Sequence, residues 1–362
     1  MALFHLSYWQ WAAPDSTPGR LLGDGPVFAG ALGSVSVGWV GVEIFFVISG
    51  FVIAYSANGV SPMRFAESRT LRLVPGGWVC ALIAAGAIVA TGVMALDDLA
   101  GPLARSLAFW PTGPWIDGVY WTLGVEIVFY ALVFGILCLN QFARIEAVAV
   151  ALGVVSALAW SAWLMTRHPV LHNLLAGRLG QLTLLSNGCQ FALGLVFWRV
   201  MSKSWNWSRA LLVLLCVVGS AIEVYSGELD HAERARQIPH VASAIGLWLV
   251  GVAAIWASFQ FNATVSRAFG RLGGLVRTIG LATYPFYLLH DPIGAGGMAV
   301  GMRLGLPPTA ALAVGLALAA AMSIGVATYL EPALRPMLAA IFRGISRRLP
   351  QGSRLLVATS TV

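Results

Sequence analysis

Long apolar blocks, separated by short polar connections, run along almost the whole chain. Each block is close to the roughly 17–25 residues that an α-helix needs to cross a bilayer. Within lipid, backbone polar groups must hydrogen-bond inside their own segment, and the alternating pattern of barrel strands is missing from the sequence. The pattern therefore predicts an all-α, polytopic membrane protein. Its expected spans lie near residues 38–55, 75–94, 119–139, 146–165, 180–198, 209–225, 241–259, 279–300 and 308–330.

The first apolar segment differs from the others. Residues 1–13, MALFHLSYWQWAA, are apolar and aromatic but stop at Pro14. As a helix they rise about 20 Å, too little to span the hydrocarbon core. We interpret them as the outer part of a spanning helix whose beginning is missing, which gives about ten transmembrane helices, the first incomplete. We expect one transmembrane domain over residues 1–334 and a basic cytoplasmic tail over residues 335–362.

Composition excludes a soluble protein. Of the 362 residues, 58% are hydrophobic and 10% are charged, whereas soluble domains carry about 25% charged residues. The net charge of +7 fits the positive-inside bias of membrane proteins and does not indicate nucleic-acid binding. The four cysteines are far apart and lie in apolar blocks, so they form no zinc or redox motif.

Basic residues are unevenly divided between the two expected sides of the membrane. Fifteen of the 22 Lys and Arg fall on one set of alternate connections and the C-terminal tail. That side is expected to be cytoplasmic. It includes the connection over residues 58–73, which we expect to be a loop. It also includes both chain ends, and two ends on one side require an even number of spans.

Polar residues inside the apolar blocks are the candidates for chemistry. An ionised carboxylate at the centre of a membrane helix costs about 2.5–3.5 kcal/mol, so Glu43 needs a partner, a proton or a water-filled cavity, unless it reaches the interface. The expected topology places Glu43, Glu126, His5 and His290 at a similar depth toward the non-cytoplasmic side. Proton-transfer chemistry can be built on such a set.

Four sequence patterns carry these residues. They are FHLSYW with His5, GVEIFFVISGFVI with Glu43 and Ser49-Gly50-Phe51, VYWTLGVEIVFYAL with Trp121, Glu126 and Tyr130, and GLATYPFYLLHDPI with His290. RTLR, from Arg69 to Arg72, follows the second pattern. In this order and at these separations they resemble the acyltransferase 3 family of bacterial integral membrane acyltransferases. The resemblance covers nearly the whole chain.

The resemblance implies a reaction and a set of sites. It implies an acyl-coenzyme A donor such as acetyl-CoA, no resident cofactor, and a hydroxyl acceptor, often on a glycan, in the bacterial inner membrane. A hydroxyl is a poor nucleophile at neutral pH and needs a positioned base, for which His5 is the candidate, oriented by Glu126 or Glu43. The expected catalytic residues are His5, Glu126 and His290. The expected substrate-binding residues are Glu43, Ser49, Gly50, Phe51, Arg69, Arg72, Trp121 and Tyr130, with the two arginines holding donor phosphates.

Two other functions are consistent with the same residues. The family's usual Arg, eleven residues before the His that His5 matches, would lie before Met1, so an inactive relative is one alternative. A secondary transporter is the other, because membrane Glu and His residues also build proton relays. No match between the two halves of the sequence supports the repeats that many transporters show.

Structural roles are alternatives for single residues. Ser49-Gly50 also suits close helix packing, and Trp121 and Tyr130 suit an interfacial aromatic belt. Arg69 and Arg72 also suit topological anchoring, and His290 suits a hydrogen bond between helices. His168 and His172 flank Pro169 with no carboxylate near them in the sequence, so no metal site is expected.

Overall fold

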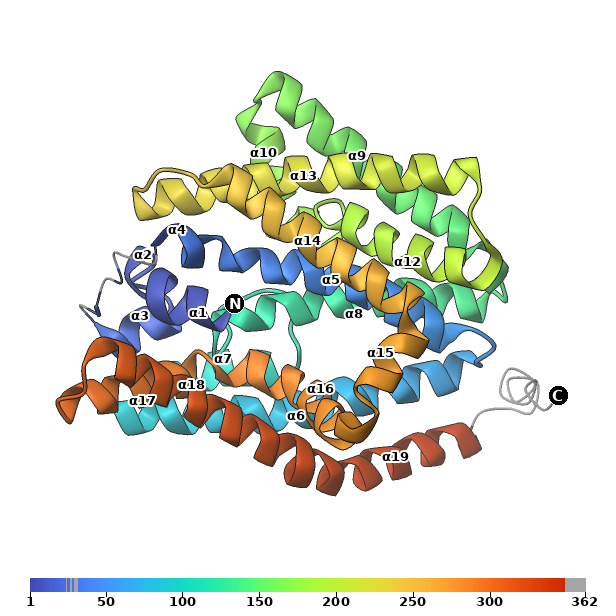
Figure 1. Ribbon diagram of the computed structural model, residues 1–362. Coiled ribbons are helices and arrows are strands. Elements are labelled where there is room, and N and C mark those ends of the chain that lie inside the picture. The colour runs from blue at the N-terminus through green and yellow to red at the C-terminus, as the bar shows by residue number, and fades with distance from the viewer. Residues whose placement is uncertain (24, 27, 29–31, 349–362) are drawn as a thin grey trace.

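The computed structural model describes residues 1–23, 25–26, 28 and 32–348, and these residues form helices with no strand among them. The long helices run roughly side by side in one bundle (Figure 1). This confirms the prediction of an all-α protein. The α-helices are α1 (Ala2–Phe4), α2 (Gln10–Ala12), α3 (Thr17–Leu22), α4 (Leu32–Val35), α5 (Gly41–Ala57), α6 (Pro62–Thr91), α7 (Leu96–Leu107), α8 (Trp121–Cys138), α9 (Ile145–Thr166), α10 (Pro169–Ala176), α11 (Arg178–Leu182), α12 (Gly188–Lys203), α13 (Trp207–Ala235), α14 (Val241–Gln260), α15 (Asn262–Ala268), α16 (Gly273–Leu289), α17 (Pro292–Arg303), α18 (Pro308–Gly325) and α19 (Glu331–Arg348).

Seven helical stretches of the described residues are long and apolar enough to cross a membrane. They are Ser36–Ala57, Pro62–Thr91, Gly118–Cys138, Phe142–Thr166, Trp207–Ala235, Val241–Gln260 and Pro308–Gly344. The chain is therefore a multi-pass membrane protein. The other three expected spans also contain helices, but those helices are short or interrupted.

The interruptions have local causes. α16 and α17 together occupy the expected span 279–300, but Pro292 has no N–H to continue the helical hydrogen bonds, and the helix breaks at His290 and Asp291. The expected span 180–198 is divided between α11 and α12, and Leu184 between them has a φ of 59°. Apolar composition continues through both breaks, so hydropathy alone does not reveal them.

The prediction of a loop over residues 58–73 is wrong. α6 begins at Pro62, with Ser61 in the N-cap position, and Arg69 and Arg72 lie within this helix. Proline is well suited to the first turn of a helix, and arginine is a good helix former. The apolar pattern marked only the later part of the helix, whereas its backbone hydrogen bonds begin before that part.

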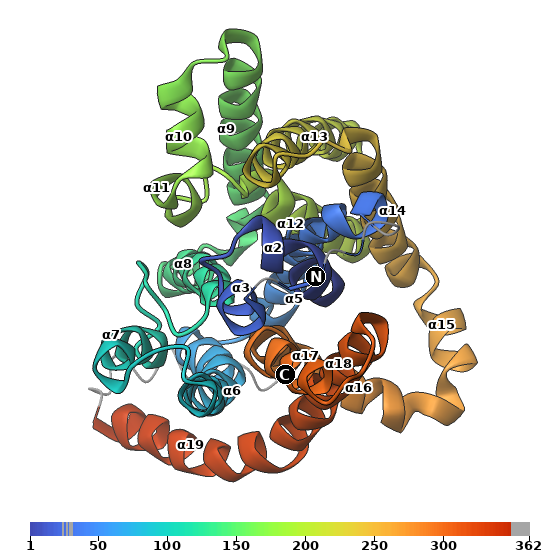
Figure 2. The same ribbon diagram turned by 90° about the vertical axis from the view of Figure 1, so that its left-hand side faces the viewer.

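The expected boundary at residue 334 also falls within a helix, because α19 continues to Arg348. α19 packs against α6 across the outside of the bundle (Figure 2). Residues 349–362 of the expected tail lie outside the described residues.

α5 occupies the middle of the bundle when the helices are viewed nearly end-on (Figure 2). It packs closely on α12, and the closest approach is at Gly50 and Gly194. A Cβ atom on Gly50 would lie 2.3 Å from the carbonyl oxygen of Phe191. Small residues allow this close packing of backbones, which is a main source of helix association in membranes. The SGF pattern thus fixes the close crossing of α5 and α12.

Candidate active site

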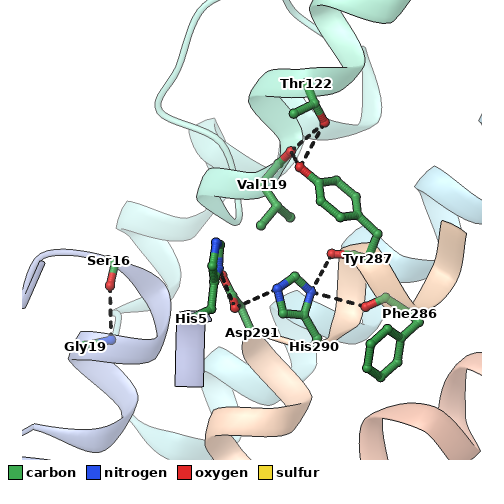
Figure 3. A network of polar contacts seen from close by, with 9 residues as sticks. All are labelled: His5, Ser16, Gly19, Val119, Thr122, Phe286, Tyr287, His290 and Asp291. Atoms are coloured by element: carbon green, nitrogen blue, oxygen red, sulfur yellow. Dashed lines mark hydrogen bonds and ion pairs between the residues drawn. The ribbon is translucent and has the colours of Figure 1, made fainter. Parts of the chain in front are cut away.

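Two histidines and an aspartate meet inside the bundle. His5 lies on a π-helical turn (His5–Trp9), His290 caps the end of α16, and Asp291 follows it at the start of α17. The imidazole rings of His5 and His290 lie 4.9 Å apart, and the Asp291 carboxylate contacts both (Figure 3). Short π-helical turns and helix breaks are frequent at functional sites. We call these three residues the His–Asp cluster.

Asp291 orients His5. Nδ1 of His5 lies 2.8 Å and 2.7 Å from the two carboxylate oxygens of Asp291. A carboxylate can only accept, so Nδ1 carries the proton and donates it. Nε2 of His5 then presents a lone pair, and among the described residues it has no hydrogen-bond partner. This is the arrangement by which an aspartate holds the imidazole of a hydrolase triad in the tautomer of a base.

His290 is held by its own helix. Its Nδ1 donates to the carbonyl oxygen of Tyr287 at 2.7 Å. Its Nε2 lies 3.2 Å from Oδ1 of Asp291 but makes no hydrogen bond with a described residue. The side chain is 1% exposed, so the surrounding helices fix the ring in place.

Contacts with α8 hold the end of α16 in place. The Tyr287 hydroxyl donates to the carbonyl oxygen of Val119 at 3.1 Å and accepts from the Thr122 hydroxyl at 3.0 Å (Figure 3). Because Tyr287 precedes His290 by less than one helical turn, these bonds restrain the His–Asp cluster against α8.

A cavity of about 530 Å³, the acidic cavity, lies on one side of the cluster. His5 and Asp291 border it, together with the carboxylates of Glu43, Asp117 and Glu223. Five tryptophans also border it, namely Trp9, Trp39, Trp115, Trp121 and Trp160. The cavity therefore combines flat apolar surfaces with hydrogen-bond acceptors.

A second cavity of about 470 Å³, the arginine cavity, lies on the other side of the cluster and is bordered by His290. Arg69 and Arg72 border it, and their side chains stack over Tyr130 and Tyr284, respectively. Nε of Arg69 and Nη1 of Arg72 are buried without a hydrogen-bond partner among the described residues. Two adjacent guanidinium groups with unpaired donors suit an anion such as a phosphate.

The two cavities meet at the cluster, because Met1, Val42 and Tyr287 border both of them. A group that acts on reactants in both cavities is therefore best placed at their junction. His5 and His290 face each other there from opposite cavities.

The structure does not bring the four residues that were expected at one depth into a single cluster. The two histidines come together, but neither Glu43 nor Glu126 contacts His5. Glu126 borders the arginine cavity and accepts hydrogen bonds from Tyr130 and from the Ser49 hydroxyl, the latter at 3.3 Å. The interpretation that one of these glutamates orients His5 is corrected, because Asp291 occupies that position.

The remaining predicted residues fall into two groups. Ser49 and Tyr130 border the arginine cavity with the two arginines, and Trp121 borders the acidic cavity. Gly50 and Phe51 border neither cavity. Gly50 contacts α12, and the Phe51 ring stacks on Phe259 of α14, so both residues have packing roles.

Sequence reasoning missed Asp291, Asn187 and Glu223. Asp291 directly follows His290 in the YLLHDPI pattern, so the signal was present but was assigned only to the histidine. Glu223 lies in an apolar block, and the desolvation argument used for Glu43 applies to it equally. Asn187 lies just before the first residue of α12, where composition gives no distinctive signal.

The described residues contain one group of three potential metal ligands, His5, His290 and Asp291, whose ligand atoms lie within 4.8 Å of one another. The hydrogen bonds of the two Nδ1 atoms already account for this geometry. His172 contacts Asp230 at 3.2 Å, a carboxylate that the sequence did not place there, but this is a pair and lacks a third ligand. The expectation of no metal stays a prediction.

Comparison with known proteins agrees with the site. A family model described as an acyltransferase domain, that of the acyltransferase 3 family, matches residues 3–330. The chain belongs to this family, and it is an acyltransferase that transfers groups other than aminoacyl groups.

Among curated proteins, the chain is 30% identical over 348 residues to the exopolysaccharide production protein ExoZ of Rhizobium meliloti (strain 1021). That match covers 88% of this chain and 94% of ExoZ. No solved structure matches the chain.

Proposed function

We propose that the protein transfers an acetyl or other short acyl group from acyl-CoA to a hydroxyl group of a glycan, with His5 as the general base. The observation that carries the proposal is the position of the His5–Asp291 pair at the junction of two chemically different cavities. Each reactant then approaches the base from its own side.

The arginine cavity suits the donor. Arg69 and Arg72 supply unpaired guanidinium donors for phosphates, and the neighbouring wall formed by Ile48, Val52 and Leu73 is apolar enough for an acyl chain. The charge bias of the sequence favours a cytoplasmic position for this side, where acyl-CoA is available. The proposal therefore includes a bacterial inner-membrane location with cytoplasmic chain ends.

The acidic cavity suits the acceptor. Arg69 and Arg72 do not border it, and the name of the relative ExoZ points to exopolysaccharide as the class of acceptor. Sugar rings have flat apolar faces and hydroxyl edges, and this cavity offers tryptophan rings and carboxylates for the two kinds of surface.

The proposed reaction is a direct transfer. Nε2 of His5 removes the proton from the acceptor hydroxyl while the hydroxyl oxygen attacks the thioester carbonyl carbon. The C–S bond then breaks, and the departing sulfur takes the proton from the His5 imidazolium, so an ester and a free thiol form. Asp291 stabilises the imidazolium that exists between these steps. Because the base acts directly on the acceptor hydroxyl, the proposed reaction needs no acyl-enzyme.

The experiment is acyl transfer by the purified full chain in lipid discs, with radiolabelled acetyl-CoA and an extract of envelope glycans. We expect label to enter the glycan as a base-labile ester. If neither acetyl-CoA nor propionyl-, butyryl- and succinyl-CoA gives labelled glycan, the proposed reaction is contradicted.

A further inference from the structure

We propose that the acidic cavity selects an uncharged, hydroxyl-rich sugar unit as acceptor and excludes sugars that carry a carboxylate, through a recognition element formed by Glu43, Asn187 and Glu223. This inference rests on the proposed function, because it concerns the acceptor side of the same site. It assigns a role to a buried network that the reaction itself does not use.

The recognition element joins three helical segments. Nδ2 of Asn187 lies 3.1 Å from Oε2 of Glu43 on α5 and 2.7 Å from Oε1 of Glu223 on α13. Both neighbours are carboxylate oxygens, so the amide must turn its NH2 group toward them. Gln190 of α12 donates to the other oxygen of Glu223.

This network has more acceptors than donors. Oδ1 of Asn187 is buried without a hydrogen-bond partner among the described residues, although Asn187 borders the cavity and is 3% exposed. Oε1 of Glu43 also has no hydrogen bond to the part of the chain that the structure describes. Nearby, the Asp117 carboxylate is 1% exposed and borders the same cavity.

A buried acceptor without a donor is unfavourable, by about tenfold or more in an equilibrium constant, so these oxygens favour a ligand that donates hydrogen bonds. Sugar hydroxyls are such donors. A site built on hydrogen bonds discriminates strongly against ligands that leave those groups unpaired.

The acidic cavity holds more carboxylates than cationic partners for them. Its six carboxylates belong to Asp15, Glu43, Asp117, Glu223, Asp230 and Asp291. Three of them have cationic or histidine partners, because Asp15 pairs with Arg234, Asp230 with His172 and Asp291 with His5. Within the described residues, Glu43, Asp117 and Glu223 have no ion-pair partner.

Arg20 is the arginine among the residues that border this cavity, and its Nε donates to the backbone oxygen of Asp15. A uronate carboxylate offers no hydrogen to the unpaired acceptors of the network, because an ionised carboxylate can only accept. Replacing the C6 hydroxyl with a carboxylate removes one such donor, and an unpaired buried acceptor disfavours binding by about tenfold or more.

The test measures binding without an acyl donor, so its failure is separate from failure of the transfer reaction. Purified full chain in lipid discs is titrated calorimetrically with matched pairs of tetrasaccharides. Each pair consists of a glucose, galactose or mannose tetramer and its C6-oxidised counterpart, which differ in the carboxylate alone. We expect at least one uncharged tetramer to bind at least about tenfold more tightly than its oxidised form.

The matched variants assign the preference to the network. In Glu43→Gln/Glu223→Gln the preference should fall to about threefold or less, because the glutamine amides offer N–H donors to the carboxylates of the oxidised probes. Glu233→Gln removes an exposed carboxylate from the same helix, α13, away from the cavity, and should keep the wild-type ratio. Thermal unfolding shows whether each variant is folded.

Three results overturn the proposal. They are failure of every uncharged tetramer to bind the wild-type chain, equal or tighter binding of the oxidised forms, and a preference that the folded double variant leaves unchanged. The first two need no variant, so the proposal stays testable if the double variant does not fold.

Discussion

Nδ1 of His5 lies 2.7 Å from Oδ2 of Asp291, although 286 residues separate the two positions in the sequence. The pair joins the first helical segment to the break between α16 and α17. It leaves Nε2 of His5 as the atom available to reactants. In the proposed reaction, the base and the residue that orients it thus come from opposite ends of the chain.

Replacement of His5 should remove the base without unfolding the protein. General-base catalysis contributes about 10²–10⁴-fold, so His5→Ala should lower the rate of acyl transfer by at least about 100-fold. Initial rates with radiolabelled acetyl-CoA measure this loss. His168→Ala, in an exposed residue outside both cavities, is the control and should keep its activity. Full activity of His5→Ala would rule out His5 as the base.

Replacement of Arg69 or Arg72 should weaken binding of the acyl-CoA donor. Arg69→Gln and Arg72→Gln each remove charged hydrogen-bond donors from the arginine cavity, and we expect the KM for acyl-CoA to rise by about tenfold in each. The KM for the acceptor should change little. Arg64→Gln, at an exposed position of the same helix, is the matched control. An unchanged KM for acyl-CoA would mean that these arginines serve as topological anchors.

Replacement of Glu126 should lower kcat less than replacement of Asp291. Glu126 accepts hydrogen bonds from Tyr130 and Ser49 and does not contact His5, so Glu126→Gln keeps the shape of the arginine cavity. We expect kcat to fall by less than about tenfold in Glu126→Gln and by at least about 100-fold in Asp291→Asn. Comparison of the two kcat values checks this order, and the reverse order would restore Glu126 as the orienting residue.

The contact of α5 with α12 should not tolerate a methyl group. Gly50→Ala places Cβ 2.3 Å from a backbone oxygen, and overpacking of this kind destabilises a protein by about 1–3 kcal/mol. We expect a lower thermal unfolding midpoint in detergent. Gly86→Ala in α6 is the control, because open space surrounds its Cβ and alanine favours the helix. Equal midpoints for the two variants would contradict the close packing.

The all-α class and the approximate positions of the helices could be predicted from the sequence. Unpaired backbone N–H and C=O groups are so unfavourable in lipid that few other structures can span a membrane. The start of α6 could not be predicted from hydropathy, because its first turns carry the polar residues Arg64, Arg69 and Arg72. The backbone hydrogen bonds of a helix form in polar and apolar stretches alike. A search for Ser61-Pro62 as a helix start would have found it.

Most residues of the site could be predicted from the sequence, but their contacts with one another could not. His5 borders the acidic cavity, and His290, Arg69 and Arg72 border the arginine cavity. The partner of His5 was not predictable, because depth along a helix does not specify which side of the helix a residue faces. Asp291 lies at a break where its side chain can reach His5, whereas the helices α5 and α8 direct Glu43 and Glu126 elsewhere.

The central claim is that Asp291 acts through His5 as base. A double-mutant cycle tests it most directly, with rates of acyl transfer for the wild type, His5→Ala, Asp291→Asn and the double variant. We predict that the double variant is no slower than His5→Ala, because Asp291 has no base left to orient. Losses that multiply in the double variant, or full activity of Asp291→Asn, would contradict the claim.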